Sequence, residues 1–196
     1  MAAIARQTIE QSGDLPEGVN LWSLSPKLST KRFRSSESFD AYTNTLAEMS
    51  AKDANLVVWI QARKFANNNF WYPSFGQWIR HGVIISGSGE RTHIGVVFST
   101  SIENSWGDRV IWSPESGPKS SQACKWVLNR AFGKGGGLVC DPFARDHNLA
   151  VWCRRLNIAY CGYAIDKDAY DHITRELAQE DIPGIQEELP LLNNGE

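Results

Sequence analysis

The sequence lacks the features that define several whole classes of protein. No apolar run among its 196 residues reaches about 18, roughly the length that a membrane-spanning helix needs. Segment 1–14 has no continuous apolar stretch of the kind found in a secretory signal peptide. These absences favour an intracellular protein that is neither secreted nor inserted in a membrane.

Cysteine pairs and an excess of positive charge are also missing. The four cysteines (Cys124, Cys140, Cys153 and Cys161) form no C-x-x-C pair, and no paired histidines accompany them as a zinc site would require. Each cysteine stands in an apolar or helical stretch, so we expect buried, reduced thiols and no metal. The formal net charge of −2 excludes a bulk basic footprint for nucleic acid, although a local patch remains open.

The chain does contain enough apolar material for one sizeable domain, with 42% hydrophobic residues and 8 tryptophans. Short apolar runs alternate with stretches of helical spacing. The runs predict strands at 18–23, 55–60, 83–86, 94–98 and 109–112, and the spacing predicts helices at 37–49, 123–132 and 168–179. We expect Ser36 or Ser38 to cap the first helix. The alternation predicts an α/β sheet with helices on both faces.

The most informative stretch is 135–170. An apolar run, 138–140, ends in Asp141, and a tight turn, a helix at 148–157 and a second apolar run ending near Asp166 follow. This order predicts a β-turn-α-β unit whose turn lies at the carboxyl end of a strand. Open α/β sheets bind ligands there, against the N-terminus of the next helix.

This stretch resembles the cofactor-binding segment of the S-adenosylmethionine-dependent DNA amino-methyltransferases, which act on adenine N6 or cytosine N4. The family pattern is D-P-F-x-G-x-G, a helix, and then G-[IV]-E-[IL]-D. Asp141, Pro142 and Phe143 match its first three residues. The resemblance is to the gene order in which the catalytic segment precedes the cofactor segment. It implies a Rossmann-like methyltransferase sheet, S-adenosylmethionine bound at these three residues, and no metal.

The same resemblance places a catalytic loop after the first expected strand. The family tetrapeptide is [DNS]-P-P-[YFW], and Ser25 and Pro26 match its first half. Lys27 and Leu28 depart from the second half. Leu28 offers no π face on which a flipped base could stack, and Lys27 brings a cation to a site where positive charge develops. The tetrapeptide FWYP at 70–73 has its aromatics in the wrong order.

The cofactor segment departs from the family pattern as well. Arg145 and His147 replace its two glycines, and Ala164 replaces the acid that grips the ribose hydroxyls. A strained backbone and a lost charge-assisted hydrogen bond together cost roughly 3–6 kcal/mol, or roughly 10²- to 10⁴-fold in affinity. Asp146 or Asp166 could take over the ribose contact from a shifted position.

The loop after Pro26 carries a basic cluster. Its members are Lys27, Lys31, Arg32 and Arg34. The resemblance places this loop near DNA, where these cations would contact phosphates, while a solvated loop is the equal alternative.

These observations predict one methyltransferase-like domain at 1–179, in which 61–112 replaces a target-recognition region, followed by an acidic tail at 180–196. The expected function is that of a diverged DNA amino-methyltransferase whose activity is weakened or lost. The alternative is a non-catalytic protein on the same scaffold: a partner subunit, a homo-oligomer, a nucleic-acid-binding module or an assembly component. A coincidental D-P-F match in an unrelated α/β protein is the third possibility.

Overall fold

The structure is a computed structural model of the whole chain, and the descriptions below concern only part of it. The described residues are 3–5, 15–25, 35–62, 77–87, 92–101, 103, 106, 110–113, 121–133 and 135–178. Of 3–5 and 110–113 only the backbone is described.

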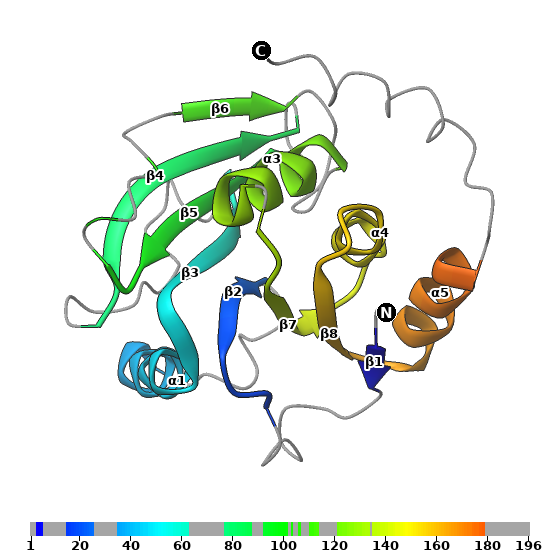
Figure 1. Cartoon of the computed structure of the whole chain (residues 1–196), viewed down its shortest axis with the longest axis horizontal. Helices are drawn as coiled ribbons and strands as arrows, with labels where there is room; N and C mark the ends of the chain where they lie inside the picture. Colours follow the sequence, from blue (N-terminus) through cyan, green and yellow to red (C-terminus); the bar gives the residue numbers. More distant parts are fainter. Residues whose placement is uncertain are drawn as a thin grey trace.

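The described strands form one eight-stranded sheet in the order β1-β8-β7-β2-β3-β5-β4-β6 (Figure 1). Their bounds are β1 Ala3–Ala5, β2 Val19–Leu24, β3 Ser50–Gln61, β4 Ile79–Ser86, β5 His93–Ser99, β6 Val110–Ser113, β7 Leu138–Ala144 and β8 Ala159–Ala164. β5 runs antiparallel to β3 and β4, and all other neighbouring pairs are parallel.

Helices cover both faces of this sheet, as the sequence predicts. Their bounds are α1 Ser36–Glu48, α3 Ser121–Phe132, α4 Asn148–Arg155 and α5 Lys167–Ala178. Figure 1 shows α3, α4 and α5 on one side of the sheet and α1 on the other. The buried residues of α3, α4 and α5 share one core cluster, and those of α1 belong to a second cluster.

The two clusters follow from the alternation of side chains along each strand. Leu21 in β2 packs with α3 and α4, whereas its neighbour Trp22 packs with α1. The central strand β3 is buried on both faces from Ala54 to Ile60. A strand in that position reads as a continuous apolar run, which explains why it could be recognised in the sequence.

Several details differ from the sequence prediction. The N-cap of α1 is Ser35, whose hydroxyl accepts a hydrogen bond from the Ser38 backbone N–H. The Ser38 hydroxyl in turn accepts one from the Ser35 backbone N–H. Neither Ser36 nor Ser38 is therefore the cap itself. The strand β1 was not predicted, because three residues at a sheet edge give too short a pattern to recognise. The expected limit of the domain at 179 and the tail 180–196 lie outside the described residues and stay predictions.

Glycine is needed at one position inside the sheet. A Cβ on Gly95 in β5 would lie 2.8 Å from the Trp59 ring of β3, its direct partner across the antiparallel pair. The indole packs against the bare backbone of Gly95, and Trp59 Nε1 donates a 3.2 Å hydrogen bond to Ser23 Oγ in β2. This arrangement ties three strands together near the sheet centre.

None of the helices described here has the length and apolar character needed to cross a membrane.

Candidate functional site

The strand order of the sheet reverses between β7 and β2. From β7 it proceeds through α4 to β8 on one side, and from β2 it proceeds through α1 to β3 on the other. The two strands are parallel and neighbours, with Trp22 opposite Cys140. Their carboxyl ends therefore lie at the same edge of the sheet, which is the edge where open α/β sheets bind ligands. Ser25 directly follows the end of β2 there, and Asp141 begins the last half of β7.

The end of β7 holds the three residues that match the D-P-F pattern. All three lie within the strand, which continues to Ala144, so the tight turn expected directly after Asp141 is wrong. The register with β8 shifts between Asp141 and Ala144, and this irregularity accommodates Pro142, which has no N–H to donate. The turn toward α4 follows at 145–147.

Asp141 is fully buried, and its Oδ1 accepts a 3.3 Å hydrogen bond from the Phe143 backbone N–H. The carboxylate thus bonds to the backbone of its own segment. Phe143 is 5% exposed, and its ring meets Tyr42 of α1 edge-on at a centroid distance of 6.2 Å. The aromatic ring is therefore packed against the α1 side of the sheet.

The end of β2 is equally enclosed. Ser25 is 7% exposed, and Ser23, two residues earlier, is 4% exposed. Pro26 and the cations Lys27, Lys31, Arg32 and Arg34 lie outside the described residues, so their contact with a base or with phosphate stays a prediction. FWYP at 70–73 lies outside them too.

The loop after β7 does not need the glycines that the family pattern has there. Among the described non-glycine residues only Asp53 and Asn157 have positive φ, and His147 has a helical φ of −88°. The expected backbone strain at Arg145 and His147 is therefore wrong, because this loop takes a path that any residue can adopt. Arg145 is exposed, and Asp146 Oδ1 accepts a 3.2 Å bond from the Asn148 backbone N–H at the start of α4.

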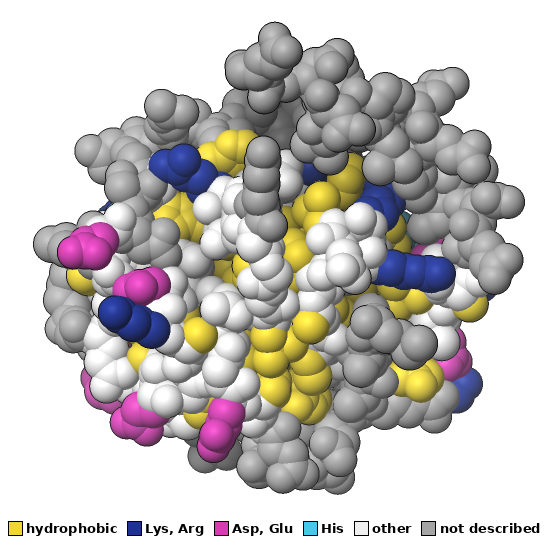
Figure 2. All heavy atoms as spheres, in the orientation of Figure 1, with side chains coloured by type: hydrophobic (Ala, Val, Ile, Leu, Met, Phe, Trp, Pro, Cys, Tyr) yellow, Lys and Arg dark blue, Asp and Glu magenta, His cyan; other side chains and the backbone are white. Residues whose placement is uncertain are grey.

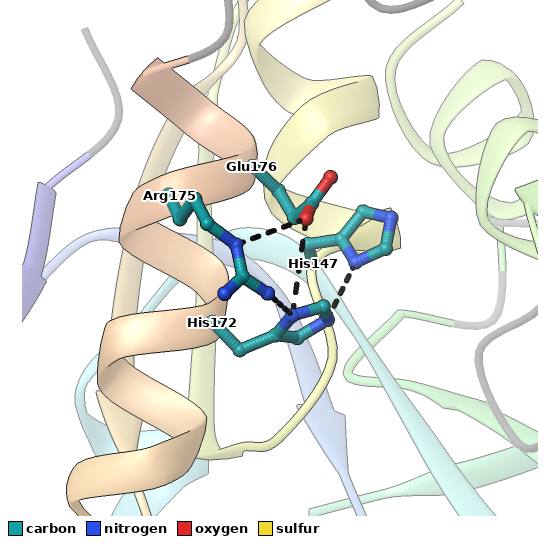
Figure 3. Close-up of polar contacts among 4 residues, drawn as sticks. All are labelled: His147, His172, Arg175 and Glu176. Atoms are coloured by element: carbon teal, nitrogen blue, oxygen red, sulfur yellow. Dashed lines mark hydrogen bonds and ion pairs between the residues drawn. The ribbon is translucent and has the colours of Figure 1, made fainter.

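A polar cluster anchors this loop to α5 (Figure 3). His147 Nδ1 lies 3.0 Å from His172 Nε2, and Arg175 approaches His172 Nδ1 at 3.1 Å. Glu176 Oε1 lies 3.5 Å from Arg175 Nε and 3.9 Å from His172 Nδ1. Burial lowers the pKa of His147, and the neighbouring His172 lowers it further. The pairing was not recognisable in the sequence, because α4 and β8 separate the two histidines.

The end of β8 differs from the family pattern in the way that the sequence indicates. Ala164 is 1% exposed and offers no acceptor. Asp166 is exposed, and its Oδ1 accepts a 2.8 Å hydrogen bond from the Ala169 backbone N–H. Asp166 therefore caps α5, which occupies one of its two carboxylate oxygens.

A phenol that the sequence did not single out lies beneath the candidate site. Tyr160 in β8 is 2% exposed, and a Cβ on Gly162 would lie 2.5 Å from its hydroxyl oxygen. Gly162 is the register partner of Asp141. Burial, and secondarily the charge of Asp141, raise the pKa of Tyr160 well above its usual value. The missing side chain at Gly162 is what lets the phenol extend along β8 toward Asp141.

Metal ligation and a basic surface were both questions raised by the sequence. Within the described part of the chain, no group of three His, Cys, Asp or Glu side chains is placed to hold a metal ion. On the face drawn in Figure 2, the described Lys and Arg side chains stand at several separate places.

Among the described strands, their order, the one antiparallel strand β5 and the reversal between β7 and β2 define a Rossmann-like methyltransferase fold. Solved structures share it along nearly the whole chain. M1.HpyAVI in complex with SAM aligns with a TM-score of 0.62 at 13% sequence identity, covering 91% of this chain and 100% of that chain.

TTHA0409 of Thermus thermophilus, provisionally described as a DNA modification methylase, aligns equally well. Its complex with S-adenosyl-L-methionine has a TM-score of 0.62 at 13% identity, covering 93% of this chain and 96% of that chain. No family model matches the sequence. No curated protein matches it either. The methyltransferase-like fold that the resemblance implies is thus confirmed.

Proposed function

We propose that this chain is a diverged S-adenosylmethionine-binding protein of the DNA amino-methyltransferase type, in which methyl transfer is weakened or lost. The observation that carries the proposal is the position of Ser25 and of the D-P-F residues toward the carboxyl ends of the parallel neighbours β2 and β7, where the strand order reverses. This edge of the sheet is where a fold of this kind binds its ligand. Two of the similar structures are complexes with this cofactor.

The residues at the carboxyl ends of β7 and β8 fit the cofactor in part. Asp141 provides a buried acceptor, Phe143 provides an apolar wall, and the exposed side chain of Arg145 does not fill the interior. Ala164 provides nothing for the ribose hydroxyls, and Asp166 is engaged as the cap of α5. Loss of one charge-assisted hydrogen bond costs about 1.5–3 kcal/mol, which is roughly 10- to 100-fold in affinity.

The backbone of the loop 145–147 adds no penalty, because it lies outside the left-handed region. We therefore expect weakened binding of the cofactor rather than its complete loss.

Bound S-adenosylmethionine would supply an activated sulfonium methyl group. This chain's own contribution at the acceptor would be the Ser25 hydroxyl, which can accept a hydrogen bond from an exocyclic amine at the β2 end. Leu28 stands where the family stacks an aromatic ring on the base. One preorganised group lost from a site costs roughly 3–4 kcal/mol of barrier. Turnover is therefore expected to be slow or absent.

DNA is the proposed macromolecular partner. The cluster Lys27, Lys31, Arg32 and Arg34 follows directly on Ser25 and Pro26 in the sequence, so it would lie beside the acceptor site. TTHA0409 is provisionally described as a DNA modification methylase, which supports the same partner.

A non-catalytic scaffold is the second candidate, and the buried Ala164 favours it. An alanine at 1% exposure closes the β8 end with an apolar side chain where a ribose ligand would need an acid. This candidate predicts a folded protein that binds DNA or a protein partner without any cofactor.

Titration calorimetry with S-adenosylmethionine tests the first candidate. We expect a Kd of roughly 10–100 μM, following the loss of roughly 10- to 100-fold from an assumed micromolar site. Asp141→Asn, which keeps the size of the side chain, should abolish it. The matched control Asp168→Asn removes an exposed carboxylate in the first turn of α5 and should leave binding unchanged.

Ala164→Glu provides the gain-of-function counterpart, because it returns the acid of the family pattern. It should tighten binding by about 10-fold or more. No binding at millimolar cofactor by the folded wild type and by Ala164→Glu would contradict the proposal and favour the non-catalytic scaffold.

A further inference from the structure

Two of the four cysteines stand opposite each other directly before the candidate cofactor residues. Cys140 in β7 and Cys161 in β8 are register partners of a parallel strand pair, and Asp141 and Gly162 are the next partners along. Both sulfur-bearing side chains point to the α1 side of the sheet, because both pack in the core cluster of that side. The fold thus brings side by side two thiols, at positions 140 and 161, that are 21 positions apart in the sequence.

The geometry of this pair suits a covalent bond. Neighbouring strands lie roughly 4.7–4.9 Å apart, and disulfides join Cα atoms at roughly 4.4–6.8 Å. Cys140 is close enough to Cys161 for the two thiols to influence each other, because it lowers the pKa of Cys161. Little movement of the backbone is needed to bring the sulfurs into bonding distance.

Cys161 differs from the other cysteines in exposure and in acidity. Cys124, Cys140 and Cys153 are buried, whereas Cys161 is half-buried. The hydrogen bond from Cys140 lowers the pKa of Cys161 to about 7, against a smaller opposing effect of burial, and Tyr163 adds to the lowering. Burial raises the pKa of Cys153 far above its usual value. The lowered pKa favours the thiolate of Cys161, and its exposure makes it the more accessible thiol of the pair.

We propose that Cys140 and Cys161 form a peroxide-sensitive disulfide couple one residue before Asp141. In the first step the Cys161 thiolate attacks one oxygen of hydrogen peroxide, the O–O bond breaks, hydroxide leaves, and Cys161 becomes a sulfenic acid. In the second step the Cys140 sulfur attacks the Cys161 sulfur. The S–S bond forms, the S–O bond breaks, and the hydroxyl leaves as water with the Cys140 proton. The two cysteines lose two electrons, and peroxide is reduced to water.

The consequence for the cofactor rests on the proposed function. The cross-link would join β7 to β8 immediately before the irregularity at Asp141 to Ala144, and would shift Asp141 relative to the β8 end. The loss of one hydrogen bond to the cofactor through such a small shift corresponds to about tenfold in affinity. We expect the oxidised protein to bind S-adenosylmethionine about tenfold more weakly than the reduced protein.

The couple can be mapped directly, because trypsin places each cysteine in its own peptide. The peptides are 120–125 for Cys124, 135–145 for Cys140, 146–154 for Cys153 and 156–167 for Cys161. The reduced, full-length protein is titrated with hydrogen peroxide, quenched with iodoacetamide and analysed by mass spectrometry. We expect a cross-link between 135–145 and 156–167, with Cys124 and Cys153 modified only after unfolding.

Variants sharpen the assignment. Cys161→Ser should abolish the cross-link, Cys140→Ser should leave a sulfenic acid on Cys161 that dimedone traps, and the matched control Cys124→Ser should keep the cross-link. If a variant fails to fold, the peptide map of the oxidised wild-type protein still tests whether Cys140 and Cys161 are cross-linked. A cross-link to Cys153, a link between chains, or Cys161 left unmodified at excess peroxide would overturn the couple.

Calorimetry of the oxidised and reduced forms separates the two proposals. A mapped cross-link together with no cofactor binding in either form would contradict the proposed function and still support the couple. Equal binding by both forms would overturn the link between the couple and the cofactor.

Discussion

His147 Nδ1 and His172 Nε2 lie 3.0 Å apart, with the two rings edge to face at a centroid distance of 5.0 Å. One imidazole must donate the hydrogen bond and the other must accept it, so at least one of these two nitrogens carries a proton. The contact therefore joins the loop that follows the candidate cofactor residues to α5, the helix that follows β8 in the chain. The contact also makes the loop sensitive to pH.

The first prediction concerns the pH dependence of stability. The pKa of His147 in the folded state is lowered by burial and by His172, with Arg155 in the same direction and Glu176 opposing. Above the unfolded value of about 6.5 both states are neutral and His147 has no effect. As the pH falls below it, the unfolded chain takes up a proton that the folded protein does not, so the free energy of unfolding decreases toward the folded pKa.

Urea unfolding between about pH 7.5 and 5 measures this decrease. His147→Gln should flatten it in the window below about pH 6.5. The control Thr45→Ala, at an exposed position of α1 that carries no titratable group, should keep the wild-type slope. An unchanged slope in His147→Gln would show that His147 is not the group responsible.

The second prediction concerns Gly95. In Gly95→Ala the new methyl would lie 2.8 Å from the Trp59 ring, which is 3% exposed and held by its bond to Ser23. Overpacking of this kind lowers the free energy of unfolding by about 1–3 kcal/mol. Gly136→Ala is the matched control, because nothing lies within 4 Å of its Cβ position and its φ is not positive. The control should change stability by less than about 1 kcal/mol, and equal losses in chemical denaturation would contradict the packing argument.

The third prediction concerns a buried bond between the sheet and residue 106. Trp106 Nε1 donates a 2.6 Å hydrogen bond to Asn55 Oδ1, and each residue is 2% exposed. Asn55→Ala leaves the indole N–H without this acceptor and should cost about 1–3 kcal/mol. In the double variant Asn55→Ala with Trp106→Phe, the loss should be smaller than the sum of the single losses. Additive losses would mean that the pair is not coupled.

The fourth prediction concerns Tyr160. Among the described residues its buried hydroxyl has no hydrogen-bond partner. Tyr160→Phe should therefore leave stability unchanged or raise it by about 1 kcal/mol, since a polar group without a partner is costly to bury. Tyr163→Phe is the comparison, because its hydroxyl bonds to Cys161 and its loss should raise the pKa of that thiol. A loss of more than about 1 kcal/mol in Tyr160→Phe would reveal a partner for the phenol.

The sequence was most informative where a strand is covered on both faces or where a turn residue ends it. The run 55–60 was recognisable because β3 is buried on both sides. The boundaries were less predictable. Ser35 instead of Ser36 or Ser38 caps α1, and β7 continues through Pro142, because a register shift with β8 absorbs the proline. Neither the N-cap of α1 nor the extension of β7 can be read from the adjacent sequence, because both depend on how the segment packs in the fold.

The candidate site divides in the same way. Residue identity and order were enough to predict that Asp141, Pro142 and Phe143 end a strand before a helix, and that Ala164 stands where an acid would be needed. The position of Ser25 at the neighbouring strand end, the contact of His147 with His172 and the pairing of Cys140 with Cys161 could be learned only from the folded protein. Strand order and register bring such residues together, and they are set by packing across the whole sheet rather than by the adjacent sequence.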